Sequence, residues 1–251
     1  IPEGWLGHDI GLAITERSTE ISTRFNRTLR QRVAVTMIDR YPQPLGFLDD
    51  DLTQTFVAGF EDMGGTWMGE CNVVKAYWDG ADSVITELED GTKIKSEKLL
   101  CAAGRISNVK DLFINNAGLE VNERGLISVD ADLKTAVPTI YAAGDIIGPP
   151  SLASASMEQG RRASCNALNI PLGNMNTMIP TGIYSIPELS SIGLSESQAK
   201  AKQPDCLVGK ARFDEIARGQ ISGIQNGLLK IVCDPQGIKI LGVMIVGEGA
   251  T

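Results

Sequence analysis

The sequence predicts an α/β fold for most of the chain, followed by a smaller α+β domain. Two runs rich in apolar residues, 33–39 and 98–105, are typical of buried strands. Segments with helix-capping residues follow runs of this kind, as in alternating strand and helix units. From about residue 179 short strand-like runs alternate with turns, which is typical of an α+β domain.

The composition is that of an ordinary globular protein. The chain has 251 residues, of which 43% are hydrophobic and 22% are charged. The net charge of −8 has no offsetting basic stripe, so we expect neither a nucleic-acid nor an anionic-membrane partner. No apolar run is long enough to span a bilayer, and no leader-like segment opens the chain.

The cysteine and histidine content argues against a disulfide framework and a metal site. Five cysteines lie far apart without metal-ligand spacing, which predicts free, mostly buried thiols in the reducing cytoplasm. His8 is the single histidine, so no multi-histidine metal site is possible, and we expect this residue at the surface. The five cysteines are Cys71, Cys101, Cys165, Cys206 and Cys233.

The run 33–39 is predicted to be the second strand of a nucleotide-binding βαβ unit. Its terminal Asp39 would then bond the hydroxyls of an adenosine ribose. A GxGxxG loop should lie about twenty residues earlier, but the segment 15–32 there is rich in Thr, Ser and Arg and shows no clean strand. The alternative for Asp39, a strand-end residue that closes a turn, is equally compatible with the sequence.

A helix and several short strands are predicted between Asp39 and residue 105. Three aspartates, 49–51, cap a helix over 52–63 that Gly64 and Gly65 end. Asp90–Gly91 marks a hairpin turn. The predicted strands are 66–71, 73–78, 83–89, 92–95 and 98–105.

The following segments connect to the most informative stretch of the chain. A short helix over 111–116, a turn over 122–125 and a strand over 126–130 are predicted. Residues 135–145 then read as a Thr before a Pro-marked turn, a short β-prone run, two alanines, Gly144 and Asp145.

This stretch has the features of a site for a large planar ligand that carries sugar-like hydroxyls. Gly144 has no side chain to obstruct such a ligand, and Asp145 could accept hydrogen bonds from hydroxyl groups. The alternative is a buried strand that closes with a turn-capping aspartate.

A helix with a small-residue start is predicted over 151–163. Ser151 is the expected N-cap, and the N–H groups and positive dipole end of the first turn would face Asp145. A group that becomes anionic on reduction, such as the pyrimidine edge of a flavin, would be stabilised there. The alternative is a capped helix that packs closely through its alanines.

The C-terminal part is predicted to be a sheet with one short helix that Ser195 caps. Residues 226–227 and 234–237 are turns. The predicted strands are 189–193, 206–213, 228–233 and 238–246.

Residues 135–163 resemble the second flavin-contacting segment of flavoprotein oxidoreductases with two dinucleotide-binding domains, the group of dihydrolipoamide dehydrogenase and glutathione reductase. Within that group, residues 150–155 and 179–184 look most like soluble pyridine nucleotide transhydrogenases. Lipoamide dehydrogenases usually carry His or Lys where Ser154 stands here. The resemblance runs from about Val33 to nearly the end of the chain.

The resemblance implies parts of two dinucleotide-binding domains built on Rossmann-like parallel sheets, followed by an α+β interface domain. Residues 1–105 would be an incomplete NAD(P)-binding domain with an anomalous segment 1–32, and residues 106–178 the C-terminal part of an FAD-binding domain. Residues 179–251 would be a truncated interface domain that pairs two subunits into a homo-oligomer. A shifted reading frame before Val33 would explain why the resemblance begins abruptly there. The alternatives are that the chain is a degenerate homologue or that its alignment to the family is wrong.

The resemblance also implies FAD as cofactor, with NAD and NADP as substrates between which a hydride moves. Asp145 beside Gly144 would hold the ribitol, and the turn at Leu152 and Ala153 would stabilise the anionic edge of the reduced flavin. Gly104 would permit close approach of the nicotinamide. No catalytic nucleophile, acid or base is assigned.

Two further interpretations stay open. One is a dihydrolipoamide dehydrogenase-like disulfide reductase, and the other is a non-catalytic dimerisation module built on residues 179–247. The first flavin-binding segment of the family is expected before residue 1. The sequence therefore looks like a fragment that we expect to have little activity alone.

Overall fold

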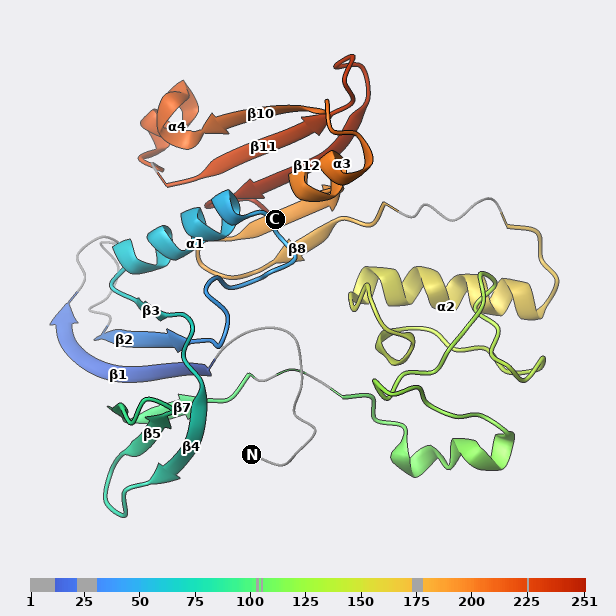
Figure 1. Ribbon diagram of the computed structural model, residues 1–251, viewed down its shortest axis with the longest axis horizontal. Coiled ribbons are helices and arrows are strands. Elements are labelled where there is room, and N and C mark those ends of the chain that lie inside the picture. Colours follow the sequence, from blue (N-terminus) through green and yellow to red (C-terminus); the bar gives the residue numbers. More distant parts are fainter. Residues whose placement is uncertain (1–11, 22–30, 103, 105, 173–177, 225) are drawn as a thin grey trace. The chain divides into compact units, whose positions relative to one another are not determined.

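The computed structural model describes residues 12–21, 31–102, 104, 106–172, 178–224 and 226–251. His8 lies outside the described residues. The chain divides into two compact units, one formed by residues 1–104 with 180–251 and the other by residues 105–179 (Figure 1).

The N-terminal sheet of the first unit has four strands in the order β3-β2-β1-β7. Strand β2 is parallel to β3, whereas β1 is antiparallel to both β2 and β7. The expectation of no clean strand in the segment 15–32 is therefore wrong for its first part. Backbone hydrogen bonds to a neighbour on each side hold β1 extended, and such pairing overrides weak local propensity. The strands are β1 (Leu12–Ile21), β2 (Gln31–Ile38), β3 (Thr66–Met68) and β7 (Lys98–Leu100).

Three further strands form a separate meander, as the sequence predicted. The Asp90 carboxylate accepts a hydrogen bond from the Thr92 N–H at 2.9 Å and closes the predicted hairpin turn. Leu88 of this sheet packs against Ile38 of the first sheet. The strands are β4 (Val73–Trp78), β5 (Val84–Leu88) and β6 (Lys93–Ser96).

Two predicted strands are shorter than expected. Strand β3 ends at Met68 because the chain at Gly69 passes so close to a neighbouring loop that a Cβ there would lie 2.7 Å from the Pro42 carbonyl oxygen. Strand β7 ends at Leu100, so the prediction that Gly104 terminates a strand is wrong. Only the segment up to Leu100 finds a pairing partner, namely β1.

The C-terminal sheet of the first unit is antiparallel, with the order β10-β11-β12-β9-β8. The predicted α+β region is thus confirmed, and the short helix begins at Ser195 as expected. The strands are β8 (Thr181–Ile183), β9 (Leu189–Gly193), β10 (Leu207–Arg212), β11 (Leu228–Cys233) and β12 (Ile240–Val246). The helices are α3 (Glu196–Lys202) and α4 (Ala217–Ser222), and a 3₁₀ turn η4 covers Phe213–Glu215.

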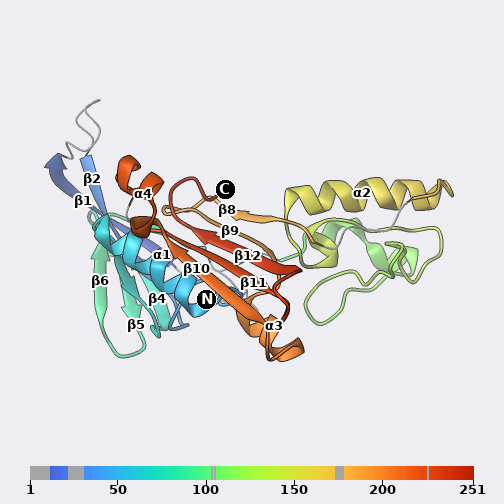
Figure 2. The same ribbon diagram turned by 90° about the horizontal axis from the view of Figure 1, so that it is seen from above.

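Helix α1 (Asp50–Asp62) lies between the N-terminal and C-terminal sheets, and Figure 2 shows it running along the C-terminal strands. Its Leu52 and Phe56 are buried in one core cluster with Leu189, Leu228 and residues of β12. Phe56 on the apolar face of this helix thus makes core contacts, whereas Met63 just after the helix is 45% exposed. The core of the C-terminal sheet is therefore completed by a helix from the N-terminal part of the chain.

The second unit contains one long helix and many turns. Helix α2 covers Ala153–Ala167, and 3₁₀ turns cover Lys110–Leu112 (η1), Ile114–Ala117 (η2) and Asp145–Ile147 (η3). The predicted short helix over 111–116 is thus two separate turns. In the predicted turn 122–125, the Gly125 N–H donates to the Asn122 carbonyl oxygen at 2.8 Å.

Two predicted strands in this unit are wrong. Residues 126–130 and the run before Gly144 contribute only isolated bridges, between Val121 and Ile127 and between Lys134 and Tyr141. Side chains close tight turns on either side, since the Asp130 carboxylate accepts hydrogen bonds from two downstream backbone N–H groups at 2.9 Å. The chain turns away before a second pair of residues can align.

Candidate functional site

Gly144 adopts a backbone conformation that favours glycine. Its φ of 86° and ψ of −161° belong to a region that other residues rarely occupy. It is buried, and its N–H donates a hydrogen bond of 2.8 Å to the side-chain oxygen of Gln159 on α2. A Cβ at this position would also lie 3.4 Å from the Ser156 hydroxyl oxygen. Gly144 is thus packed directly against α2.

Asp145 begins a single 3₁₀ turn immediately after Gly144. Its carbonyl oxygen accepts a hydrogen bond from the Gly148 N–H at 3.1 Å, and its side chain is half-buried. Thr135 fixes the turn that precedes this segment, because its hydroxyl lies 2.9 Å from the Ile140 carbonyl oxygen and 3.1 Å from that of Val137. The stretch 135–145 is therefore a series of turns that leads to a carboxylate.

Helix α2 begins without a side-chain cap. Leu152 is the N-cap residue in an extended conformation, and the prediction of Ser151 in that role is wrong. The Leu152 N–H turns back to the Pro150 carbonyl oxygen at 3.0 Å, so the helix starts two residues later than expected. Leu152 is half-buried and Ala153 is exposed. The first N–H groups of a helix have no partner within it, so this end suits an anionic group.

Four of the predicted residues therefore lie in one unit: Gly144, Asp145, Leu152 and Ala153. A carboxylate and an uncapped helix start are chemically suited to a flavin, whereas the space beside Gly144 is occupied by Ser156 of α2. A cavity of about 360 Å³ in the same unit is lined by other residues, among them Leu119, Ile127 and Ser128. That cavity has no charged group apart from Glu120 among its lining residues.

The other two predicted residues lie in the first unit. Asp39 follows the last residue of β2, and its carboxylate accepts a hydrogen bond from the Tyr41 N–H at 3.1 Å. This is the turn contact that the alternative interpretation of Asp39 predicts. The Arg40 guanidinium stacks over the Tyr41 ring, 4.9 Å from its centroid. Gly104 is exposed with a φ of 94° and lies beyond the end of β7.

Strand β1, as far as the structure describes this sheet, lacks part of what a dinucleotide pyrophosphate requires. Strand β1 contains no glycine and runs antiparallel to β2, whereas the phosphate-binding turn of a βαβ unit follows a strand parallel to its neighbour. Within the described residues, β1 therefore does not supply the predicted phosphate contact. Asp39 and Arg40 are the groups in this region that fit a nucleotide ribose and its phosphate.

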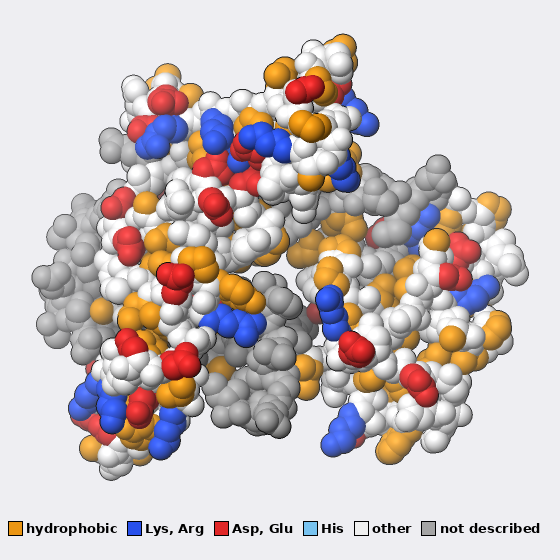
Figure 3. Space-filling view, in the orientation of Figure 1, with side chains coloured by type: hydrophobic (Ala, Val, Ile, Leu, Met, Phe, Trp, Pro, Cys, Tyr) orange, Lys and Arg blue, Asp and Glu red, His pale blue; other side chains and the backbone are white. Residues whose placement is uncertain are grey.

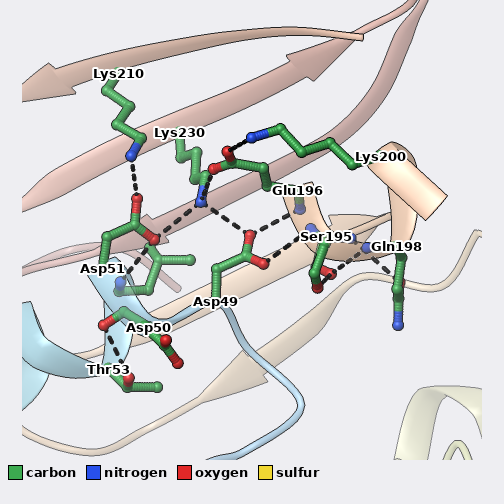
Figure 4. Close-up of polar contacts among 12 residues, drawn as sticks. Asp49, Asp50, Asp51, Thr53, Ser195, Glu196, Gln198, Lys200, Lys210 and Lys230 are labelled. Carbon is green, nitrogen blue, oxygen red and sulfur yellow. Dashed lines mark hydrogen bonds and ion pairs between the residues drawn. The ribbon is translucent and has the colours of Figure 1, made fainter. Parts of the chain in front are cut away.

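A buried polar cluster joins α1, α3 and β11 (Figure 4). The Lys230 side chain is 1% exposed, and its ammonium lies 2.6–3.0 Å from carboxylate oxygens of Asp49, Asp51 and Glu196. Asp49 also accepts hydrogen bonds from two backbone N–H groups at the start of α3. Figure 3 shows acidic and basic side chains gathered beside the C-terminal sheet. The cluster connects the two halves of the first unit.

The charges of this cluster stabilise one another. Burial opposes charge on Lys230, but its hydrogen bonds to Glu196, Asp51 and Asp49 outweigh that effect and raise the pKa of the ammonium. Burial likewise opposes charge on Asp49, yet the pKa of its carboxyl group is lowered by bonds from the α3 backbone and from Lys230. The hydrogen bond from Lys200, followed by that from Lys230, lowers the pKa of Glu196. All four groups are charged near neutral pH.

The thiols are more accessible than the sequence suggested. All five cysteines are free, Cys206 is buried and Cys101 is exposed, so the expectation of mostly buried thiols is wrong. Cys101 follows the end of β7 instead of lying within a strand. In the described ranges, no group of three His, Cys, Asp or Glu side chains is arranged to hold a metal ion. None of the described helices combines the length and hydropathy of a membrane span.

The sequence model of the pyridine nucleotide-disulphide oxidoreductases matches residues 17–160. The chain belongs to this family. The model of the pyridine nucleotide-disulphide oxidoreductase dimerisation domain matches residues 179–251. The mixed α/β fold predicted from the sequence agrees with membership of this oxidoreductase family.

Relatives with curated names are soluble pyridine nucleotide transhydrogenases. The chain is 41% identical over 220 residues to that of Pseudomonas aeruginosa strain LESB58, covering 87% of this chain and 47% of the relative. It is 39% identical over 218 residues to that of Mycobacterium bovis strain BCG / Pasteur 1173P2, covering 86% and 46%. The chain thus spans about half the length of the curated relatives it matches.

Solved structures of the oxidoreductase family share the fold. LpdA from Mycobacterium tuberculosis superposes with a TM-score of 0.77 at 23% identity, covering 86% of this chain and 47% of that one. The HOCl-induced flavoprotein disulfide reductase RclA from Escherichia coli superposes with a TM-score of 0.77 at 24% identity, covering 86% and 49%.

Sequence reasoning missed the contact between Gln159 and Gly144. The buried residues of α2 are Ala155, Gln159 and Ala163, spaced four residues apart. A single polar residue in an otherwise small apolar stripe is the signal that could have identified it, because a buried amide needs a hydrogen-bond partner.

Proposed function

We propose that this protein is an FAD-dependent oxidoreductase that transfers a hydride between NADPH and NAD, as a soluble pyridine nucleotide transhydrogenase. The observation that carries the proposal is the identity of about 40% with such transhydrogenases over 87% of the chain. The packing of Gly144 against α2, the carboxylate that follows it and the uncapped start of α2 support a flavin as the cofactor.

The chain's own residues would bind and orient the cofactor. Asp145 would accept hydrogen bonds from ribitol hydroxyls, and Gly144 would hold the backbone before it against α2. The N–H groups at Leu152 and Ala153 would stabilise negative charge at the helix start. When bound, the flavin supplies the hydride-accepting and hydride-donating centre.

The nicotinamide dinucleotides would bind in the first unit. We assign Asp39 to the ribose, Arg40 to the 2′-phosphate that distinguishes NADP from NAD, and Gly104 to the side where the nicotinamide approaches. Support comes from the relatives and from the position of Asp39 at the carboxyl end of β2, where ligands bind in α/β sheets. Strand β1 contains no glycine, so it does not support this assignment with a phosphate-binding turn.

We also propose a division into residues 1–105 for dinucleotide binding, 106–178 for the flavin and 179–251 for pairing two copies. The chain passes from one compact unit to the other near residues 104 and 180, which supports the limits of the flavin segment, while residues 1–104 and 180–251 belong to one unit. The match of a dimerisation-domain model to residues 179–251 supports a homo-oligomer. Five free thiols suit the reducing cytoplasm, where we place the protein.

The test is hydride exchange with matched variants. A longer version of the protein that also carries the first flavin-binding segment expected before residue 1 should, when supplied with FAD, reduce a thionicotinamide analogue of NAD with NADPH, whereas the chain alone should show little exchange. Asp145→Ala should raise the Kd for FAD roughly 10-fold to 100-fold, the range expected for lost hydrogen bonds to a charged group. Asp132→Ala, which removes an exposed carboxylate of the same unit, should leave this Kd unchanged.

The result also separates the alternative functions. Reduction of lipoamide without exchange between nicotinamides would favour a disulfide reductase. A dimer by light scattering that binds neither FAD nor NADPH would favour a non-catalytic dimerisation module. Either outcome would contradict the proposed transhydrogenase activity.

A further inference from the structure

We propose that Gln159 is a positioning residue for the flavin, because its side-chain oxygen holds the Gly144 backbone immediately before Asp145. This inference rests on the proposed function. It assigns a role to a buried polar side chain that neither the hydride transfer nor the direct cofactor contacts use.

The burial of Gln159 requires an explanation. The residue is 4% exposed and lies between Ala155 and Ala163, which are 0% and 8% exposed. An alanine would continue the close packing of this face, whereas an amide costs free energy to bury unless it is hydrogen-bonded. Its oxygen accepts the Gly144 N–H at 2.8 Å in the interior. The amide is therefore placed where a specific backbone group needs an acceptor.

Gly144 touches α2 at a second point one turn earlier. The Ser156 side chain lies against it, and the Ser156 hydroxyl donates to the Leu152 carbonyl oxygen at 3.0 Å. Ser156 and Gln159, which are three residues apart on α2, therefore both lie against Gly144. This spacing places both side chains on the same helix face.

The orientation of Gly144 determines the next residues. Its carbonyl oxygen accepts the Ile147 N–H at 3.0 Å, which forms the 3₁₀ turn that begins with Asp145. Helix α2 thus supplies the uncapped N–H groups at its start and, through Gln159, an acceptor for the backbone residue that precedes Asp145. A flavin that contacts both Asp145 and the helix start would need this segment to be held against α2.

The experiment compares three variants at position 159 in the longer version of the protein that carries the first flavin-binding segment. Gln159→Met keeps the side-chain length but removes the acceptor, Gln159→Asn keeps the amide but withdraws it by one methylene, and Gln159→Glu keeps the acceptor oxygen. Met157→Leu is the control, because that side chain is 76% exposed on the same helix. Far-UV circular dichroism confirms folding of each variant.

Three readouts are measured. Hydrogen exchange of the Gly144 amide should be at least about 10-fold faster in Gln159→Met and Gln159→Asn, as expected for a lost buried hydrogen bond. The Kd for FAD should rise at least about 10-fold in the same two variants, and the visible flavin spectrum should shift. In Gln159→Glu and in the Met157→Leu control, the exchange rate and the Kd should stay within about 3-fold of the unmodified protein. The visible flavin spectrum of both should not shift.

Each outcome is decisive. If the longer version without a substitution binds FAD and Gln159→Met or Gln159→Asn binds it equally well, the role of Gln159 is refuted while the proposed function stands. Unchanged exchange of the Gly144 amide refutes it as well. If Gln159→Met does not fold, Gln159→Asn alone decides between these results. If the longer version without a substitution binds no FAD, the proposed function fails and this inference fails with it.

Discussion

Replacing Lys230 by methionine should destabilise the first unit by about 2–4 kcal/mol. Removing one partner of a buried ion pair costs about 3–5 kcal/mol, because the remaining charge is left uncompensated. The expected loss of stability lies around the lower end of that range for two reasons. Asp51 and Glu196 are 27% and 20% exposed, and each keeps a second partner, Lys210 and Lys200 respectively.

Urea unfolding followed by circular dichroism measures this difference. Lys210→Met is the matched control, since its ammonium also bonds Asp51 but its side chain is 46% exposed. An exposed pair contributes at most about 1 kcal/mol, so the control should lose far less stability. The slope of the unfolding free energy with urea should stay the same in both variants.

The pH dependence gives an independent check on the Lys230 cluster. Its carboxyl groups have lowered pKa values, so their stabilisation is present above the ordinary values of 3.8 and 4.5 and is lost as the pH falls. Lys230 has a raised pKa, so its stabilisation is present below 10.5 and is lost only as the pH rises further. The difference between the unmodified protein and Lys230→Met should therefore be constant from about pH 5 to 9 and shrink below pH 4.

Two results would refute this reasoning. One is a difference below about 1 kcal/mol at neutral pH, which would mean that the cluster contributes no more than a surface pair. The other is a difference that grows as the solution is acidified.

Three further predictions concern local structure. Ser195→Ala removes the capping box of α3 and should cost about 0.5–2 kcal/mol in urea unfolding; an unchanged midpoint would show that the cap contributes nothing. Gly242→Ala would place a Cβ 1.9 Å from a backbone oxygen, so it should lower stability by about 1–3 kcal/mol or prevent folding. Gly209→Ala, with nothing within 4 Å in the same sheet, should be nearly neutral, and equal effects at both positions would contradict the steric argument. Thr135→Val keeps the shape but loses the hydroxyl bonds of the turn at residues 135–140, so amide exchange there should become faster; unchanged rates would argue that the turn does not depend on the hydroxyl.

Elements with complete local signals could be predicted from the sequence. Helix α1 has its acidic start, its glycine stop and its apolar face, and it spans residues 50–62 against the predicted 52–63. The Ser195 cap and its Gln198 partner define α3, and β9 and β11 have the predicted bounds. In each case local propensity and tertiary packing favour the same structure.

Elements that depend on distant pairing could not be predicted. Strand β1 is extended because β2 and β7 flank it, and neither partner can be identified from residues 12–21. At the candidate site, the sequence identified Gly144 and the helix after it. It did not reveal the acceptor of the Gly144 N–H, because that bond joins residues fifteen apart across a turn. The short range of propensity rules explains both omissions.

The placement of α1 has a consequence for how this protein can be divided or recombined. Leu52 and Phe56 fill the core beneath Leu189 and Leu228, although some 130 residues separate the helix from the first of these strands. If the chain were cut at residue 179, the C-terminal piece would lose Leu52 and Phe56, and the apolar side chains that they cover would be exposed to water. Grafting the C-terminal sheet onto another protein would therefore succeed only if helix α1 were transferred with it.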